Sequence, residues 1–199
     1  RIVVTGSSTG IGRAMAQEFA AADADVVVTC RHSLAEAQQV VDSIKASGHD
    51  GRIVQGDVRD VSQLPRLVDD AWNCFGWVDV WVNNAGVDLL TGDNAKLSYE
   101  DKLEALLDID VRSAVLLSKL VGERMAAAGG GSILNIGWDQ SDRGMGGDSG
   151  ELFSAAKNAI MGFTRSLAVS LAPTVRVNCI APGWIRTAWG EQASDPWQE

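Results

Sequence analysis

Short runs of β-branched and other apolar residues alternate along the chain with longer stretches of helical periodicity, and this alternation limits the possible folds more than any other feature. The candidate strands cover residues 2–5, 25–30, 52–57, 78–83, 132–136 and 174–180. The candidate helices cover residues 11–22, 34–47, 61–75, 99–128 (as two helices) and 152–172. Such a pattern is typical of βαβ units, in which the strands are parallel and the crossovers right-handed. The sequence therefore predicts a single α/β domain, residues 1–199, with a doubly wound parallel sheet between two helical layers.

The composition argues against several kinds of partner. A formal net charge of -9 and a pI near 4.7 favour neither nucleic acid nor an anionic membrane as a partner, because both require a basic surface. Cys30, Cys74 and Cys179 are scattered without a C-x-x-C pair, which predicts small core residues in a reducing compartment and no metal site. The apolar runs fall short of the roughly 20 residues of a membrane span, and no charged-then-apolar leader is seen. We therefore expect a cytoplasmic domain without a metal.

The first candidate strand leads into the first candidate helix through a glycine-rich segment, Thr5-Gly6-Ser7-Ser8-Thr9-Gly10-Ile11-Gly12. Because Gly6, Gly10 and Gly12 have no side chains, the backbone there can approach a pyrophosphate closely. The helix N-terminus adds N–H donors and a partial positive charge. An ordinary tight turn is the alternative interpretation, but the preceding strand and the following helix are the context that dinucleotide binding requires.

Three further segments complete a family pattern. Asn83-Asn84-Ala85-Gly86 follows the fourth candidate strand, and Pro182-Gly183 follows the last one. Phe153-Ser154-Ala155-Ala156-Lys157 has the spacing of a Tyr-x-x-x-Lys pair, with phenylalanine in the tyrosine position. Together with the glycine-rich segment, they resemble the short-chain dehydrogenase/reductase family, nearest to its 3-oxoacyl-carrier-protein reductase-like members. The resemblance implies a Rossmann-like fold, a nicotinamide cofactor and a small-molecule substrate; it also implies that this chain lacks the family's C-terminal helix and last strand.

The resemblance assigns cofactor contacts to residues at the ends of several strands. Ser7, Ser8 and Ile11 would line the glycine-rich turn together with Gly6, Gly10 and Gly12. Asp57 and Val58 would contact the adenine, although a simple turn aspartate is a competing interpretation of Asp57. The remaining implied contacts are Asn84, Ala85, Gly86, Lys157, Pro182, Gly183, Ile185 and Thr187.

Arg31 bears on the choice between NAD and NADP. The second candidate strand ends without the acidic residue that would bind the ribose 2′-hydroxyl of NAD. An arginine next to that position suits the 2′-phosphate of NADP. The sequence therefore favours NADP(H) over NAD(H), with a solvated surface arginine as the alternative.

The catalytic positions of the family are altered in this chain. In the family, a serine polarises the substrate carbonyl, a tyrosine donates the proton, a lysine lowers the tyrosine pKa and binds ribose, and an asparagine anchors a water relay. By resemblance, Trp138 takes the serine position, Phe153 the tyrosine position and Asp110 the asparagine position, whereas Lys157 is kept. The chain has a single tyrosine, Tyr99, which lies far from Lys157 in sequence, so no shift of alignment restores the tyrosine–lysine pair.

Several residues are candidates to replace the missing proton donor. Glu151 lies two residues before Phe153, and an apolar pocket would raise the pKa of such a carboxyl group. Lys157 is an alternative donor. Three aspartates in the Gly-, Asp- and Ser-rich segment 137–150, expected to be a mobile loop, are further candidates: Asp139, Asp142 and Asp148. For each carboxylate the alternative is a solvated loop residue or a helix N-cap, the latter also open to Ser149.

Three functions remain compatible with these features. The first and favoured one is an NADP(H)-dependent oxidoreductase that acts on a carbonyl or hydroxyl substrate with a non-standard donor. The second is a catalytically silent NADP(H) sensor, and the third is a partner subunit of an active relative. Apolar residues on more than one face of the helices near residues 108–128 and 152–172 also predict a homodimer or homotetramer.

Overall fold

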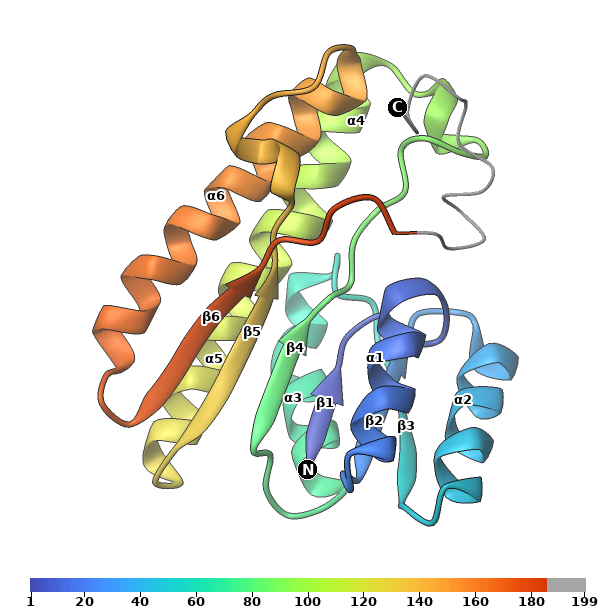
Figure 1. Cartoon of the computed structure of the whole chain (residues 1–199), viewed down its shortest axis with the longest axis vertical. Helices are drawn as coiled ribbons and strands as arrows, with labels where there is room; N and C mark the ends of the chain where they lie inside the picture. The colour runs from blue at the N-terminus through green and yellow to red at the C-terminus, as the bar shows by residue number, and fades with distance from the viewer. Residues whose placement is uncertain (186–199) are drawn as a thin grey trace.

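The computed structural model of the protein, which describes residues 1–185, contains a parallel sheet of six strands in this part of the chain (Figure 1). The strands are β1 (Ile2–Val4), β2 (Val26–Cys30), β3 (Gly51–Gln55), β4 (Val80–Asn83), β5 (Gly131–Ile136) and β6 (Val175–Ile180). Their order in the sheet is β3-β2-β1-β4-β5-β6, and every neighbouring pair is parallel. This order confirms the predicted doubly wound, Rossmann-like architecture.

The sheet lies between two layers of helices. The helices are α1 (Gly10–Ala21), α2 (Leu34–Ala46), α3 (Leu64–Asn73), α4 (Tyr99–Leu106), α5 (Ser113–Ala127) and α6 (Asp148–Leu171). Alternate residues of a strand point to opposite faces, so Val3 and Ile133 pack with α3, α5 and α6, whereas Val4 and Val28 pack with α1 and α2. Both faces of the central strands are therefore buried, which explains why the sequences of those strands are continuously apolar.

The stretch 99–128 forms two helices, as predicted, and a π-helical turn, Leu107–Arg112, separates α4 from α5. The boundary predicted for the last helix was wrong. The segment 137–150, expected to be a loop, contains a 3-10 turn at Asp139–Asp142, and α6 already begins at Asp148 instead of at residue 152. Gly147, with φ 85°, precedes the first turn, so neither Asp148 nor Ser149 is the N-cap.

A buried polar network joins the central strands to two helices beneath the carboxyl end of the sheet. Asn83 Nδ2 on β4 donates to Ser118 Oγ on α5 and to Asn135 Oδ1 on β5, each over 2.8 Å. Asn135 Nδ2 donates to Thr164 Oγ1 on α6, and Trp81 Nε1 donates to Asn83 Oδ1. Because buried polar groups are costly unless paired, this network fixes α5 and α6 relative to the strands that end at the site.

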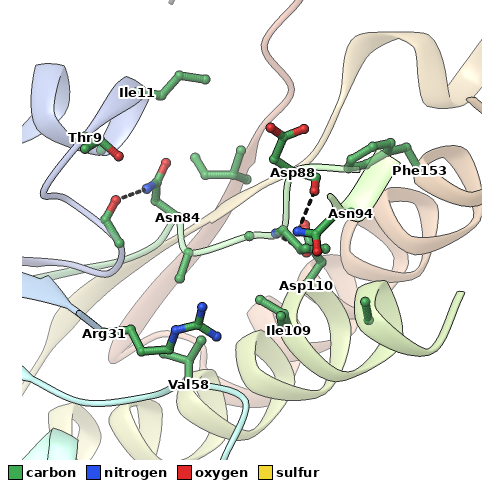
Figure 2. Close-up of a pocket in the computed structure, with 18 of the residues that line it drawn as sticks. Thr9, Ile11, Arg31, Val58, Asn84, Asp88, Asn94, Ile109, Asp110 and Phe153 are labelled. Carbon is green, nitrogen blue, oxygen red and sulfur yellow. Dashed lines mark hydrogen bonds between the residues drawn. The ribbon is translucent and has the colours of Figure 1, made fainter. Parts of the chain in front are cut away.

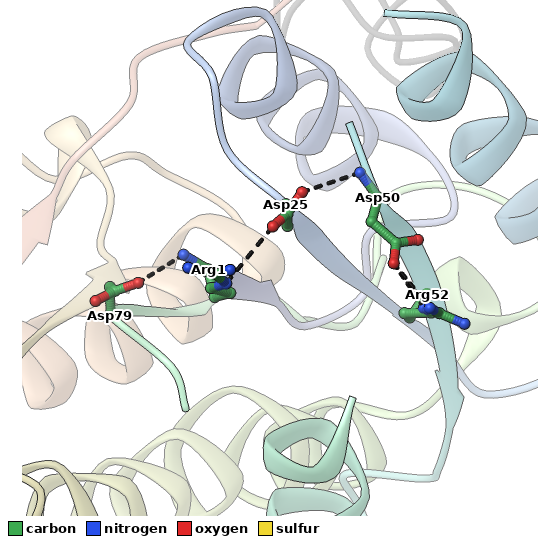
Figure 3. Close-up of polar contacts among 5 residues, drawn as sticks. All are labelled: Arg1, Asp25, Asp50, Arg52 and Asp79. Atoms are coloured by element: carbon green, nitrogen blue, oxygen red, sulfur yellow. Dashed lines mark hydrogen bonds and ion pairs between the residues drawn. The ribbon is translucent and has the colours of Figure 1, made fainter. Parts of the chain in front are cut away.

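Charged residues connect the opposite, amino-terminal edge of the sheet (Figure 3). Arg1 Nε lies 3.5 Å from Asp25 Oδ2, and Asp25 Oδ1 accepts a hydrogen bond from the Asp50 amide. Arg52 Nη2 lies 2.8 Å from Asp50 Oδ2, and the main-chain nitrogen of Arg1 lies 2.6 Å from Asp79 Oδ2. Such exposed pairs contribute little to stability. Substitutions at this edge can therefore serve as controls for substitutions in the site.

Within residues 1–185, the helices do not combine the length and hydropathy that a membrane span requires.

Candidate cofactor and active site

A cavity of about 1170 Å³ lies across the carboxyl ends of the strands. It is bordered by the turns after β1, β2, β3, β4 and β5 and by residues that follow β6. The order of the strands reverses between β1 and β4, and the crevice at such a switch point is where doubly wound sheets bind ligands. Figure 2 shows Arg31 and Val58 on one side of this cavity and Asp88, Asp110 and Phe153 on the other.

The glycine-rich turn has the geometry of a phosphate-binding turn. Gly6 and Gly10 have φ values of 62° and 57°, in the region that favours glycine. A Cβ on Gly12 would overlap the Gly6 carbonyl oxygen, whereas a Cβ on Gly10 would meet open space. No side chain caps the N-terminus of α1 at Thr9, so the amide N–H groups of its first turn are available to an anion. These residues fit the pyrophosphate of a dinucleotide.

Thr5 holds this turn against the segment after β4, a role that the sequence did not reveal. Its Oγ1 accepts hydrogen bonds from the Asn84 and Ala85 amides over 2.9 and 3.0 Å. Asn84 Nδ2 donates to the carbonyl oxygens of Thr5 and Gly6. A Cβ on Gly6 would lie 2.9 Å from Ala85 Cα, so this close contact also requires glycine.

Ser7 stabilises the turn by hydrogen bonds to β1 and β2 and does not line the cavity. Its side chain is fully buried; Oγ donates to the Val4 carbonyl over 2.7 Å and accepts from the Thr29 amide over 3.1 Å. The expected cofactor contact of Ser7 is therefore not among the cavity contacts, whereas Ser8 and Ile11 do line the cavity. Thr9 lines it as well, although no sequence motif marked it as a contact.

Two arginines and an aspartate form the end of the cavity next to β2 and β3. Arg31 Nη1 lies 3.8 Å from Asp57 Oδ2, and Asp57 Oδ1 accepts the Arg59 amide over 2.9 Å. Arg31, Asp57, Val58 and Arg59 all line the cavity, and the Arg31 side chain is about half exposed (53%). An exposed guanidinium of this kind can turn toward a phosphate group without breaking a buried contact.

Asp110 joins three parts of the site at the other end of the cavity. Asp110 Oδ1 lies 2.8 Å from Lys157 Nζ on α6, and Asp110 Oδ2 accepts the Val87 amide over 3.0 Å. Asp110 belongs to the π-helical turn, and π turns often occur at functional sites. A Cβ on Gly86 would lie 2.9 Å from Asp110 Oδ1, so glycine leaves room for the carboxylate.

Trp138 and Phe153 form an aromatic wall beside this ion pair. Their ring centroids are 6.2 Å apart and the ring planes are inclined by 63°, an edge-to-face contact. Both residues and Lys157 line the cavity. Met145 lines it too, which the sequence did not indicate.

The structure does not bring the proposed carboxylate donors into the cavity. Glu151 is exposed, and its Oε2 accepts a hydrogen bond from Tyr99 Oη over 3.2 Å. Asp142 and Asp148 are exposed, and neither these two nor Asp139 line the cavity. The backbone amide of Asp139 donates to the Pro182 carbonyl oxygen over 3.2 Å, so its segment supports the chain after β6.

The segment after β6 closes the cavity from the far side. Pro182, Gly183, Trp184 and Ile185 line it, in agreement with the placement expected for Pro182, Gly183 and Ile185. Thr187 lies outside the described residues. Among residues 1–185, no group of three or more His, Cys, Asp or Glu side chains is arranged to hold a metal ion.

A turn and a crevice of this kind bind a dinucleotide, which makes the chain a dinucleotide-binding α/β protein. Comparison with known families narrows this class: the model for "short chain dehydrogenase" matches residues 1–197. The protein belongs to the short-chain dehydrogenase family.

Relatives within the family differ in the substrates that their names record. The chain is 37% identical over 188 residues to a 3-oxoacyl-[acyl-carrier-protein] reductase of Synechocystis sp., which covers 93% of this chain and 74% of that protein. It is 35% identical over 186 residues to Elsinochrome reductase 1 of Elsinoe fawcettii, covering 93% and 68%. A short chain dehydrogenase from Burkholderia cenocepacia, crystallised in complex with NADP, superimposes with a TM-score of 0.83 at 34% identity, covering 95% of this chain and 76% of that chain.

Proposed function

We propose that the protein is an NADP(H)-dependent oxidoreductase that transfers hydride between the nicotinamide and a carbonyl or hydroxyl carbon of a small molecule. The observation that carries the proposal is one continuous cavity, which runs from the uncapped N-terminus of α1 to the Lys157–Asp110 ion pair. One end suits a pyrophosphate and the other retains the lysine that family members use. The relative crystallised with NADP supports the choice of cofactor.

In this proposal each residue at the catalytic end has a limited task. A lysine ammonium carries three N–H donors, so Lys157 can bond to Asp110 and still donate to a cofactor ribose or to a substrate oxygen. Asp110 positions that ammonium, while Trp138 and Phe153 exclude water from the reacting carbon. The bound cofactor supplies or accepts the hydride. Lys157 is the proton donor, because it is the residue at this end that combines a proton to give with access to the cavity.

Arg31 is the proposed determinant for NADP(H). Its exposed guanidinium borders the cavity beside Asp57 and Val58, where the resemblance expects the adenosine part of the cofactor. A charge-assisted bond to the 2′-phosphate would then compete with the long 3.8 Å contact to Asp57.

A specific observation favours a second candidate, a catalytically silent NADP(H)-binding protein. The positions that carry a serine and a tyrosine in the family hold Trp138 and Phe153, whose side chains have no group that transfers a proton to a carbonyl. A protein of this kind would bind the cofactor in the same cavity without turnover, as a sensor or as the partner subunit of an active relative.

Binding and turnover assays distinguish the candidates. We expect NADPH to bind with saturable affinity and to be consumed with at least one member of a panel of carbonyl compounds. Lys157→Met should abolish turnover, whereas Lys119→Met, on the exposed side of α5 in a pair with Glu123, should not. Binding without turnover would support the silent sensor, and no binding would leave only the partner subunit.

A further inference from the structure

The hydroxyl groups that line the cavity are confined to its cofactor end. Within residues 1–185, the lining hydroxyls are those of Ser8, Thr9, Thr29 and Ser33, which follow β1 or lie at the end of β2. The lining residues from β4, α4, β5 and α6 include no serine, threonine or tyrosine. A neutral carbonyl must gain a proton as it accepts hydride, and at this end of the cavity that proton would have to come from Lys157, whose ammonium is paired with Asp110.

The charges along the cavity are separated in the same direction. Arg31 and Arg59 line its cofactor end, whereas three carboxylates line the other end beyond Asp110: Asp88, Asp101 and Glu104. At that other end, Lys157 is the basic residue among the described lining residues, and its charge is matched by Asp110. The potential at the substrate end is therefore negative, which disfavours anionic substrates and attracts cations.

The carboxylates at this end keep their charge available to a ligand. Asp88 Oδ1 accepts the backbone amides of Leu90 and Thr91, Asp88 Oδ2 accepts the Thr91 hydroxyl, and Asp101 Oδ2 accepts the Ser98 hydroxyl. None of these partners carries a positive charge. Glu104, on the face of α4 that also carries Asp101, is exposed.

An aromatic surface accompanies the negative charge. Trp138 and Phe153 lie edge to face, and Trp184 borders the same cavity. Aromatic faces attract cations, with tryptophan the strongest of the side chains. The lining thus combines the two features that bind an organic cation, whereas a neutral carbonyl would depend on the paired Lys157 ammonium for its proton.

From these observations we infer that the substrate class of this site is a C=N compound, bound as its iminium cation, in preference to a ketone or aldehyde. The inference rests on the proposed function, because it assumes hydride transfer with NADP(H). The iminium carbon accepts the hydride as a new C–H bond while the C=N π pair moves to nitrogen. The substrate loses its positive charge, the cofactor becomes oxidised, and the step needs no proton from the protein. Water then protonates the amine product.

A matched pair of two-ring substrates tests the inference. The N-methyl dihydroisoquinolinium ion carries a permanent charge, and tetralone is its neutral ketone counterpart. With the full chain and NADPH, and after correction for the uncatalysed reaction of each, we expect kcat/KM for the iminium ion to exceed that for the ketone by about 100-fold, the lower range of general acid catalysis. Phe153→Tyr should raise ketone reduction slightly and leave iminium reduction unchanged.

A binding measurement provides a readout that is independent of turnover. Protonated tetrahydroisoquinoline should bind several-fold tighter than the neutral alcohol tetralol, measured by calorimetry with the NADP-loaded and the unloaded protein. Glu104→Gln should weaken binding of the amine by roughly threefold, the scale of an exposed charge pair, without changing that of the alcohol. Glu100→Gln removes an equal charge from an exposed position of α4 outside the cavity lining, and should change neither.

The outcomes separate this inference from the proposed function. Ketone reduction that is accelerated as much as iminium reduction, or an amine that binds no tighter than the alcohol, would overturn the inference and leave the oxidoreductase proposal intact. NADPH binding without reduction of either compound would overturn both. Tight binding of the amine together with fast reduction of the iminium ion would support both the inference and the proposed function.

Discussion

Lys157 Nζ lies 2.8 Å from Asp110 Oδ1, in an ion pair whose side chains are 13% and 2% exposed. The second oxygen of Asp110 accepts the Val87 amide, so the carboxylate receives two donors from different elements. An asparagine, which the family resemblance expects there, has one acceptor oxygen, so its NH2 group would face one of these two donors. The aspartate therefore suits a site in which the lysine is held by the protein, because both of its oxygens accept a donor.

This pair should be strongly coupled energetically. Lys157→Met leaves a buried carboxylate without its counter-charge, and we expect it to lower the free energy of unfolding by about 3 kcal/mol. Asp110→Asn leaves the Lys157 ammonium unpaired and should cost less, because that side chain is more exposed than the Asp110 carboxylate. The double variant Lys157→Met with Asp110→Asn leaves neither charge and should cost least. Urea unfolding in a double-mutant cycle measures the coupling. Additive effects of the two substitutions would contradict a direct interaction.

The cofactor preference should depend on Arg31. Since this side chain is about half exposed, solvent screening reduces its contribution, and we expect NADPH to bind about tenfold more tightly than NADH. Arg31→Ala should remove the preference by weakening NADPH alone. Arg52→Ala, at the opposite edge of the sheet, is the matched control (Figure 3). Equal titration constants for the two cofactors in the unmodified protein would refute the assignment.

The order of the strands and the glycine-rich turn were predictable because both depend on local sequence. Runs of β-branched residues mark buried parallel strands, and right-handed crossovers then leave few topologies. The sequence predicted two helices in the stretch 99–128, but it did not predict the π turn at Leu107–Arg112 that joins them. The contacts of the π turn are tertiary, because Asp110 bonds to Lys157 and Val87, which lie far from it in sequence.

The sequence pointed to many residues that line the cavity, but also to Ser7 and Glu151, which do not line it. Position 151 precedes Phe153 by two residues, which is about 200° around a helix. Glu151 therefore points away from the face that carries Phe153 and Lys157, which the sequence did not show because the predicted helix began after Glu151, at residue 152. The part played by Thr5, which bonds to Asn84 and Ala85, depends on a contact between distant segments, and no local pattern marks it.

The cysteine thiols should react slowly at neutral pH. Burial is the main cause that raises the pKa of Cys30, Cys74 and Cys179 above the usual value of a thiol. The reactive thiolate therefore forms at higher pH in the folded protein than in the unfolded one. Alkylation by iodoacetamide, followed by mass spectrometry across a pH series, should show rates that rise later in the folded protein than in urea. A thiol that reacts faster when folded at neutral pH would contradict this.

The protein should form a homodimer or homotetramer. Val169 on α6 is 80% exposed, and Leu107 and Tyr99 are each more than 40% exposed. Light scattering at micromolar concentration should report an oligomer, consistent with an interface of at least about 1,000 Å². Val169→Lys should weaken association more than Val61→Lys, a change at an exposed valine before α3. A monomeric mass for the unmodified chain would disprove the prediction.

Restoring the two family hydroxyls should not by itself give efficient reduction of a ketone. Phe153→Tyr places a phenol one helical turn from Lys157, and Trp138→Ser supplies the second hydroxyl. An ammonium lowers the pKa of a nearby phenol, but the Lys157–Asp110 pair has no net charge, so this lowering is reduced. We therefore expect the double variant to gain little in tetralone reduction, and the addition of Asp110→Asn to raise kcat/KM by about 10²-fold, within the range of general acid catalysis. If the double variant already reduces the ketone as well as the triple variant, Asp110 does not control the charge of the site.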